Sequence, residues 1–149
     1  MLREKIDSLI AESMKADDKF NVDMFRLVKA EYLKYNASKE AVKTPMNDAI
    51  EVNILKKMAK QRRESAELYG QGGRTDLQAK ELAEAEFIEA YLPQESTAED
   101  IKKAIDSATT EHGIVLLQKN MGQIIKKVKE LLPNADGKLV ADLVKKRLS

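Results

Sequence analysis

The chain has 149 residues, contains no cysteine, and only 5% of its residues are aromatic. The absence of cysteine excludes disulfide frameworks and cysteine-based zinc sites, and it is typical of proteins in a reducing compartment. No uninterrupted run of about 18 apolar residues occurs, so no membrane span is predicted. The first twenty residues mix acidic and basic side chains without an apolar stretch, which is not the pattern of a secretory signal. We therefore expect a cytoplasmic protein with no membrane partner.

Charge is distributed unevenly along a chain whose net charge is only +1. Residues 76–100 contain eight acidic side chains and one lysine, whereas residues 117–149 contain eight basic and three acidic side chains. The middle of the chain is therefore acidic and its last third is basic. A basic segment of this kind can meet phosphate groups, while the acidic segment is suited to a protein partner.

Apolar residues recur at intervals of three and four along most of the chain, and strand-like alternation is absent. This period is that of amphipathic helices, so the sequence predicts an all-α fold. The helices are expected at residues 2–14, 22–36, 45–69, 75–92, 97–111, 118–132 and 136–148.

Turn and capping residues divide these helices into two groups. Thr44-Pro45 predicts the start of the longest helix, and the glycine-rich turn at 70–73 ends it, so that residues 45–69 and 75–91 form a long hairpin. The break before Ser96, together with a capping box from Ser96 to Glu99, predicts a boundary near Pro93. We expect an N-terminal helical domain at 1–93 and a small three-helix bundle at 94–149, whose last helix is capped by Asp136.

No arrangement of residues typical of catalysis is present. His112 is the only histidine, and the glycines at 70–73 lack the spacing and the Lys-Ser/Thr pair of a phosphate-binding loop. The many acidic residues are spaced as on helix surfaces and have no paired histidines, so no metal site is predicted. We expect no catalytic residues, no cofactor and no small-molecule substrate.

Two charged residues of the predicted hairpin lie on faces that are otherwise apolar. At about 100° per residue, Arg62 shares a face with Leu55 and Met58, and Glu84 shares one with Leu77 and Ile88. The favoured interpretation is a structural ion pair of Arg62 with Glu84, or failing that with Glu81; a ligand site is the alternative.

The basic tail carries the candidate binding residues. Its two predicted helices have continuous apolar stripes, and the lysines lie off these stripes. Gly122 lowers helix stability by about 1 kcal/mol relative to alanine, which indicates a close approach by a neighbouring helix or by the backbone of a partner. A solvated lysine-rich face without any ligand is the alternative. The candidate nucleic-acid-binding residues are Lys119, Gly122, Lys126, Lys129, Lys138, Lys145 and Lys146.

A family resemblance appears at these same residues. The stretches 121–126 (MGQIIK) and 134–140 (NADGKLV), together with 60–65 (KQRRES) and 91–93 (YLP), resemble the pattern of the YqeY-like proteins. The tail is also similar to that of the B subunit of the bacterial glutamyl/aspartyl-tRNA amidotransferase. It departs from that tail at Asp136-Gly137, where Asn-Pro is usual, and at Ile125, where Met is common.

The resemblance implies a non-catalytic protein whose C-terminal helices bind tRNA, in the context of a glutamine-dependent carbon-nitrogen ligase. The implied role is accessory to tRNA-dependent amidation or to aminoacylation, with an amidotransferase or an aminoacyl-tRNA synthetase as protein partner. Two other hypotheses remain open. One is a protein–protein adaptor that uses the acidic surface of 76–100 and binds no RNA; the other is an enzyme that transfers amide nitrogen, which no residue of the chain supports.

Overall fold

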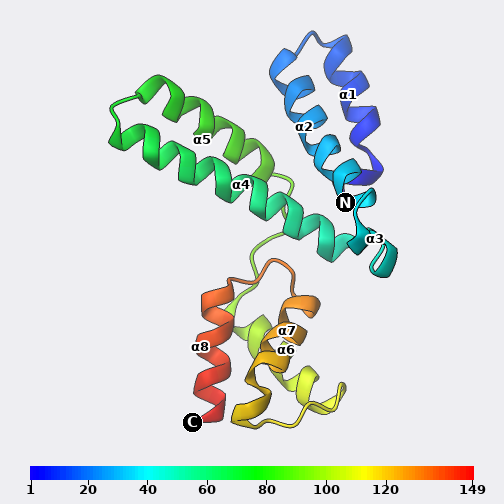
Figure 1. Ribbon diagram of the computed structural model, residues 1–149, viewed down its shortest axis with the longest axis vertical. Coiled ribbons are helices and arrows are strands. Elements are labelled where there is room, and N and C mark those ends of the chain that lie inside the picture. The colour runs from blue at the N-terminus through cyan, green and yellow to red at the C-terminus, as the bar shows by residue number, and fades with distance from the viewer. The chain divides into compact units, whose positions relative to one another are not determined.

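The computed structural model describes residues 1–149 and confirms the predicted all-α fold class, because it contains helices and no β-strand (Figure 1). None of its helices is both long enough and apolar enough to cross a membrane. The α-helices are α1 (Ile6–Lys15), α2 (Lys19–Asn36), α3 (Lys39–Lys43), α4 (Asp48–Gln71), α5 (Thr75–Glu89), α6 (Ala98–Thr110), α7 (Met121–Leu131) and α8 (Gly137–Leu148). Two short 3-10 helices are found at Leu2–Glu4 and Gln118–Asn120.

The chain forms two compact units, Met1–Leu92 and Pro93–Ser149. We call them the N-terminal unit and the C-terminal unit. Each has its own hydrophobic core. In the N-terminal unit the core is built from α1, α2, α4 and α5, and in the C-terminal unit from α6, α7 and α8.

The N-terminal unit is dominated by α4 and α5, which lie side by side and run in opposite directions (Figure 1). Gly73 has a φ of 72°, a left-handed conformation that glycine adopts without strain, and it turns the chain between the two helices. A Cβ atom at Gly70 would collide with the side chain of Gln78. The atoms that it would meet are at the end of a flexible side chain, which can shift to make room for a larger residue.

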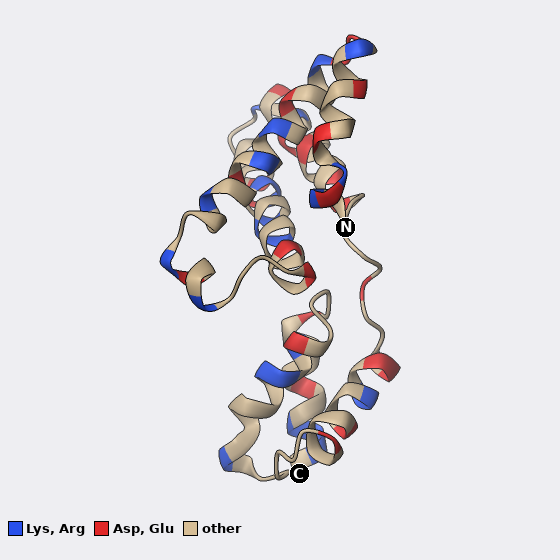
Figure 2. Ribbon diagram, turned by 90° about the vertical axis from the view of Figure 1, so that its right-hand side faces the viewer, with Lys and Arg blue, Asp and Glu red and all other residues tan.

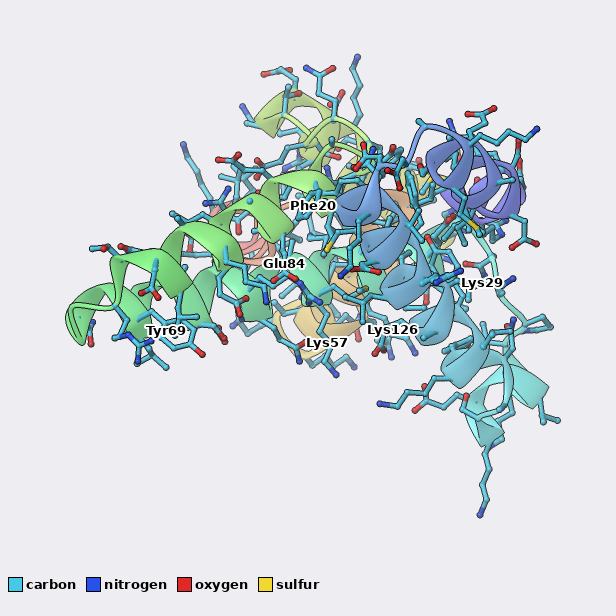
Figure 3. The ribbon with its side chains drawn as sticks, turned by 90° about the horizontal axis from the view of Figure 1, so that it is seen from above. Phe20, Lys29, Lys57, Tyr69, Glu84 and Lys126 are labelled. Atoms are coloured by element: carbon cyan, nitrogen blue, oxygen red, sulfur yellow. The ribbon has the colours of Figure 1, made fainter.

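Aromatic side chains join α2 to the end of α5. Phe25 packs edge to face against Phe87 with ring centroids 4.9 Å apart. Phe20, which Figure 3 labels on α2, packs against Phe87 at 5.7 Å. Tyr91 completes the cluster at 5.5 Å from Phe87. Burial raises the pKa of the Tyr91 hydroxyl above its usual value. Such ring pairs contribute about 0.5–1.5 kcal/mol beyond the area that they bury, so this cluster stabilises the packing of α2 against the end of α5.

Several helix bounds differ from those predicted: α1 begins at Ile6 and not at 2, α2 at Lys19 and not at 22, α7 at Met121 and not at 118, and the short helix α3 was not predicted. Capping explains two further differences, at the starts of α4 and α6. Thr44 ends the short helix α3 in an extended conformation, as a residue before proline tends to do, so Thr44-Pro45 does not open the long helix. The side chain of Asn47 instead accepts a hydrogen bond of 2.9 Å from the Ile50 N–H, and α4 begins at Asp48. Similarly, α6 is capped by Thr97 with Asp100, one residue later than the predicted box. The Thr97 backbone N–H donates to Asp100, and this bond holds the pKa of the Asp100 carboxyl below its usual value.

A buried carboxylate connects the first residues of the chain with α2 and α4. Glu51 is completely buried. Its oxygens accept hydrogen bonds from the Arg3 backbone N–H at 2.7 Å, the Arg3 guanidinium at 2.8 Å and the Tyr32 hydroxyl at 2.9 Å. Burial, followed by the bond to Glu51, raises the pKa of Tyr32, so Tyr32 remains a hydrogen-bond donor. The guanidinium of Arg3 also pairs with the exposed Asp48 at 2.7 Å.

This arrangement predicts very different effects for two neighbouring acidic residues of α4. Glu51→Ala leaves a partly buried guanidinium and a buried hydroxyl unpaired, and should lower the unfolding free energy by roughly 3 kcal/mol. Asp48→Ala removes an exposed partner of the same arginine and should lower it by about 0–1 kcal/mol. Urea unfolding followed by tyrosine fluorescence measures both effects in the N-terminal unit, where all four tyrosines lie. Equal losses for the two variants would contradict the structural role of Glu51.

Candidate nucleic-acid interface

The core of the C-terminal unit fixes which faces of its helices meet solvent. Ile124 and Val128 of α7 and Val140 and Val144 of α8 are completely buried. They pack in one cluster with residues of α6. Asp136 caps α8 as predicted, because its carboxylate accepts a hydrogen bond of 3.2 Å from the Leu139 N–H. The rotation of α7 and α8 about their axes follows from these buried positions.

The outward face of α7 carries three of the candidate residues. Gly122, Lys126 and Lys129 fall within about 60° of one another on the side of the helix opposite Ile124 and Val128. All three are exposed. Lys127 lies on a flank of the helix and pairs with Glu130 at 3.2 Å. The structure therefore brings together the α7 residues selected from the sequence.

The candidate residues of α8 fall into two groups. Lys138 and Lys145 are seven residues apart and share one exposed face of the helix. Lys146 is turned about 100° from Lys145 and lines a groove between α6 and α8 together with Lys102 and Arg147. Lys146 therefore lies at the edge of the face that Lys138 and Lys145 share, on the side of α8 that meets α6.

Two lysines lie beside the start of α8. A Cβ atom at Gly137 would be 3.4 Å from the Nζ of Lys129, so this side chain of α7 reaches the first residue of α8. Lys138 follows Gly137 directly. The N-terminal end of a helix carries a partial positive charge, which adds to that of the two ammonium groups. Lys119 lies further back, in the 3-10 helix that precedes α7 and not in α7 itself.

The six candidate lysines take part in none of the ion pairs of the C-terminal unit. These pairs are Lys102 with Glu99 at 3.6 Å, Lys127 with Glu130 at 3.2 Å, and Arg147 with Asp106 at 2.5 Å. None of the six ammonium groups is therefore in direct contact with a carboxylate, although the exposed Asp142 shares the face of Lys138 and Lys145. Figure 2 shows basic positions along the helices of this unit. Such a surface attracts anions.

Arg62 and Glu84 do not form the ion pair that the sequence predicts. The Arg62 guanidinium donates to the Met58 carbonyl oxygen at 3.2 Å, and its Nε is buried without a hydrogen-bond partner. The ion pair across the α4–α5 hairpin is made by the next residue, Arg63, with Glu89 at 2.5 Å. This bond raises the pKa of the Arg63 guanidinium. Arg62 differs because its side chain turns back along its own helix instead of crossing to α5.

A family model described as Yqey-like protein matches residues 3–148, nearly the whole chain. The chain belongs to the YqeY-like family. The match includes α7 and all of α8, so the candidate interface lies within the part of the chain that the family model describes. No curated protein matches the chain.

Gly122 of this YqeY-like chain faces open space. A Cβ atom at this position would have no neighbour within 4 Å. Close packing against a neighbouring helix, one of the two interpretations offered by the sequence, is therefore wrong. The approach of a partner's backbone, the other interpretation, stays a prediction.

The open space at Gly122 predicts that Gly122→Ala stabilises the C-terminal unit by up to about 1 kcal/mol, because alanine has the higher helix propensity. Hydrogen exchange of the slowest amides of α7 and α8 measures this change. The matched control is Gly113→Ala. Gly113 has a φ of 66°, so alanine there should be destabilising by about 1–2 kcal/mol. A destabilising Gly122→Ala would mean that the glycine has a structural role in the free protein.

Proposed function

We propose that this YqeY-like protein is a non-catalytic tRNA-binding protein, accessory to tRNA-dependent amidation or to aminoacylation in translation. The observation that carries the proposal is the set of exposed lysines on α7 and α8 that have no carboxylate partner. Proteins bind folded RNA largely by placing such cations against backbone phosphates. The similarity of residues 121–126 and 134–140 to the tail of the amidotransferase B subunit supports tRNA as the RNA concerned.

The composition of the C-terminal unit supports a folded RNA over a single strand. Residues 93–149 contain no Phe, Tyr or Trp. Proteins that bind single strands stack bases on aromatic side chains, whereas double-stranded RNA is recognised mainly through its shape, its phosphates and its 2′-hydroxyls. A lysine-rich surface without aromatic rings suits the second mode.

We further propose that the two units are separate domains, at 1–93 and 94–149, with different roles. The three-helix bundle of α6, α7 and α8 would be the tRNA-binding domain, as its similarity to the amidotransferase tail implies. The domain with the long α4–α5 hairpin would be available to a protein partner, either an amidotransferase or an aminoacyl-tRNA synthetase. With either partner, we expect the protein to act in the cytoplasm.

A second candidate function is a protein–protein adaptor that binds no RNA. One observation favours it: the half-buried Glu81 and Glu84 and the exposed Glu86 of α5 belong to none of the ion pairs of the structure, so their carboxylates are available to a basic partner. The two functions make opposite predictions for the binding of tRNA by the purified protein.

The tRNA proposal predicts that Lys126→Glu/Lys138→Glu lowers the affinity for total tRNA and makes the salt dependence shallower. Each phosphate contact contributes roughly 0.7–0.9 to the slope of log affinity against log salt concentration. The fold should be retained, because both lysines are exposed and lie off the buried stripes. Fluorescence anisotropy titrations at several salt concentrations measure affinity and slope together.

The control for this variant is Lys15→Glu/Lys39→Glu, which makes the same change in net charge on exposed positions of the N-terminal unit. It should affect tRNA binding much less than the tail variant. Equal losses for the two variants would remove the tail from the binding site. If the wild-type protein did not bind tRNA even at low salt, the adaptor function would be favoured instead.

Gly122→Ala provides a test in which a loss of tRNA binding cannot be caused by unfolding. If an RNA backbone approaches Gly122, the added methyl group should weaken tRNA binding while the free protein becomes more stable. An unchanged affinity would place Gly122 outside the contact surface.

A further inference from the structure

A second basic feature of the C-terminal unit lies on the other flank of α8. It is a groove of about 260 Å³ between α6 and α8, lined by Lys102, Leu143, Lys146 and Arg147. Three of the four lining side chains are cationic and none is acidic. Lys102 and Arg147 are absent from the candidate residues selected from the sequence, because they are 45 positions apart and only the fold brings them together.

Arg147 is oriented by one hydrogen bond to a carboxylate, and its other N–H groups remain available to a ligand. Arg147 Nη1 donates to Asp106 Oδ1 at 2.5 Å. A guanidinium has five N–H donors in a fixed planar arrangement, and a single bond to Asp106 leaves most of them available. The arginine side chain is 34% exposed, so a ligand in the groove can reach it. Asp106 thus orients the guanidinium without covering it.

The two lysines of the groove have at most a weak ion pair with a carboxylate. The bond of Lys102 to Glu99 is long, at 3.6 Å, and both side chains are largely exposed. Exposed pairs of this kind contribute about 0–1 kcal/mol, so an anion can take the place of Glu99 at little cost. Lys146 is in no ion pair of the unit. The groove therefore offers three cations, of which only Arg147 has a short bond to a carboxylate.

We propose that this groove binds a backbone phosphate of the same RNA that contacts the α7–α8 surface. The proposal rests on the proposed tRNA-binding function and extends the contact across α8 to α6. Continuity supports it: Lys145 of the α7–α8 surface and Lys146 of the groove are consecutive residues on one exposed helix. An RNA that lies along α8 would have the lysines of α7 on one side of the helix and Lys102 of α6 on the other. Arg147 and the lysines provide charge-assisted hydrogen bonds of the type that phosphate oxygens accept.

Lys102 and Lys103 provide a matched pair of variants for the test. They are consecutive, equally charged and exposed on α6, but only Lys102 lines the groove. Lys102→Ala should lower tRNA affinity several-fold at low salt and reduce the salt slope by roughly 0.7–0.9, the value of one phosphate contact. Lys103→Ala should leave affinity and slope close to those of the wild type. Alanine is the better helix former, so neither change should unfold α6.

The experiment compares the wild type, Lys102→Ala, Lys103→Ala and Lys126→Glu/Lys138→Glu in anisotropy titrations with total tRNA at several salt concentrations. A loss confined to Lys102→Ala and the tail variant supports the groove. Equal losses for Lys102→Ala and Lys103→Ala would overturn it, because they would report long-range charge alone. Loss with the tail variant but none with Lys102→Ala would overturn the groove and leave the proposed function intact. Absence of tRNA binding by the wild type would overturn both.

A second measurement separates an RNA phosphate from a small free anion. Amide chemical shifts of the labelled protein are followed during titration with inorganic phosphate alone, against chloride at equal ionic strength. Saturable shifts around Lys102 and Arg147, combined with unchanged tRNA binding in Lys102→Ala, would identify a small-anion site and overturn the RNA assignment. Shifts in the same residues with tRNA, removed by Lys102→Ala/Lys146→Ala, are the result expected from the proposal.

Discussion

In the C-terminal unit, Ile101, Ile124, Val128, Val140 and Val144 are completely buried and come from all three helices. Their burial fixes the rotation of each helix about its axis, and so decides where every other side chain of the helix points. Lys126, Lys129, Lys138 and Lys145 are directed to solvent because the positions between them are needed for the core. The exposed lysine surface is determined by the core: shifting the whole apolar stripe of a helix by one residue would rotate the helix by about 100° and change where its lysines point.

The N-terminal unit depends on a different kind of contact. Glu51 places a carboxylate in the core and supplies three hydrogen bonds there, two to Arg3 and one to Tyr32. A buried charge is unfavourable unless it is paired, so this contact fixes which residues can lie against α4 at that point. The first turn of the chain and α2 are thereby held at defined positions. Apolar packing alone is less selective, because it accepts many side chains of similar volume.

The sequence predicts contacts between residues close together in the chain better than contacts between residues far apart. Helical periodicity and local capping residues are short-range signals. They predict the Asp136 cap and every α-helix except the short α3, but they misplace most helix starts by a few residues. The bonds of Glu51 join residues 19 and 48 positions apart, and no local pattern contains them. One signal was available: Glu51 precedes Leu55 by four residues and Met58 by seven, which places an acid on an apolar stripe.

Some residues of the candidate site can be predicted from the sequence, and others depend on how the helices pack. The lysines of α7 and α8 could be selected from helix periodicity, since each helix has a clear apolar stripe. Lys102 could not, because its relation to Arg147 depends on how α6 packs against α8. Arg62 shows a further limit: its face could be predicted, but a long flexible side chain has many rotamers, and helix periodicity does not select the one that donates to the Met58 carbonyl oxygen.

The presence of two hydrophobic cores has a consequence for cooperativity. A chain with one core loses its structure in one step, whereas a chain with two has two cooperative units that can open at different free energies. Damage to the Glu51 contacts acts on one of these units and leaves the apolar residues of α6, α7 and α8 packed together. We therefore expect that a variant can lose the structure of its first 92 residues while α6, α7 and α8 stay folded.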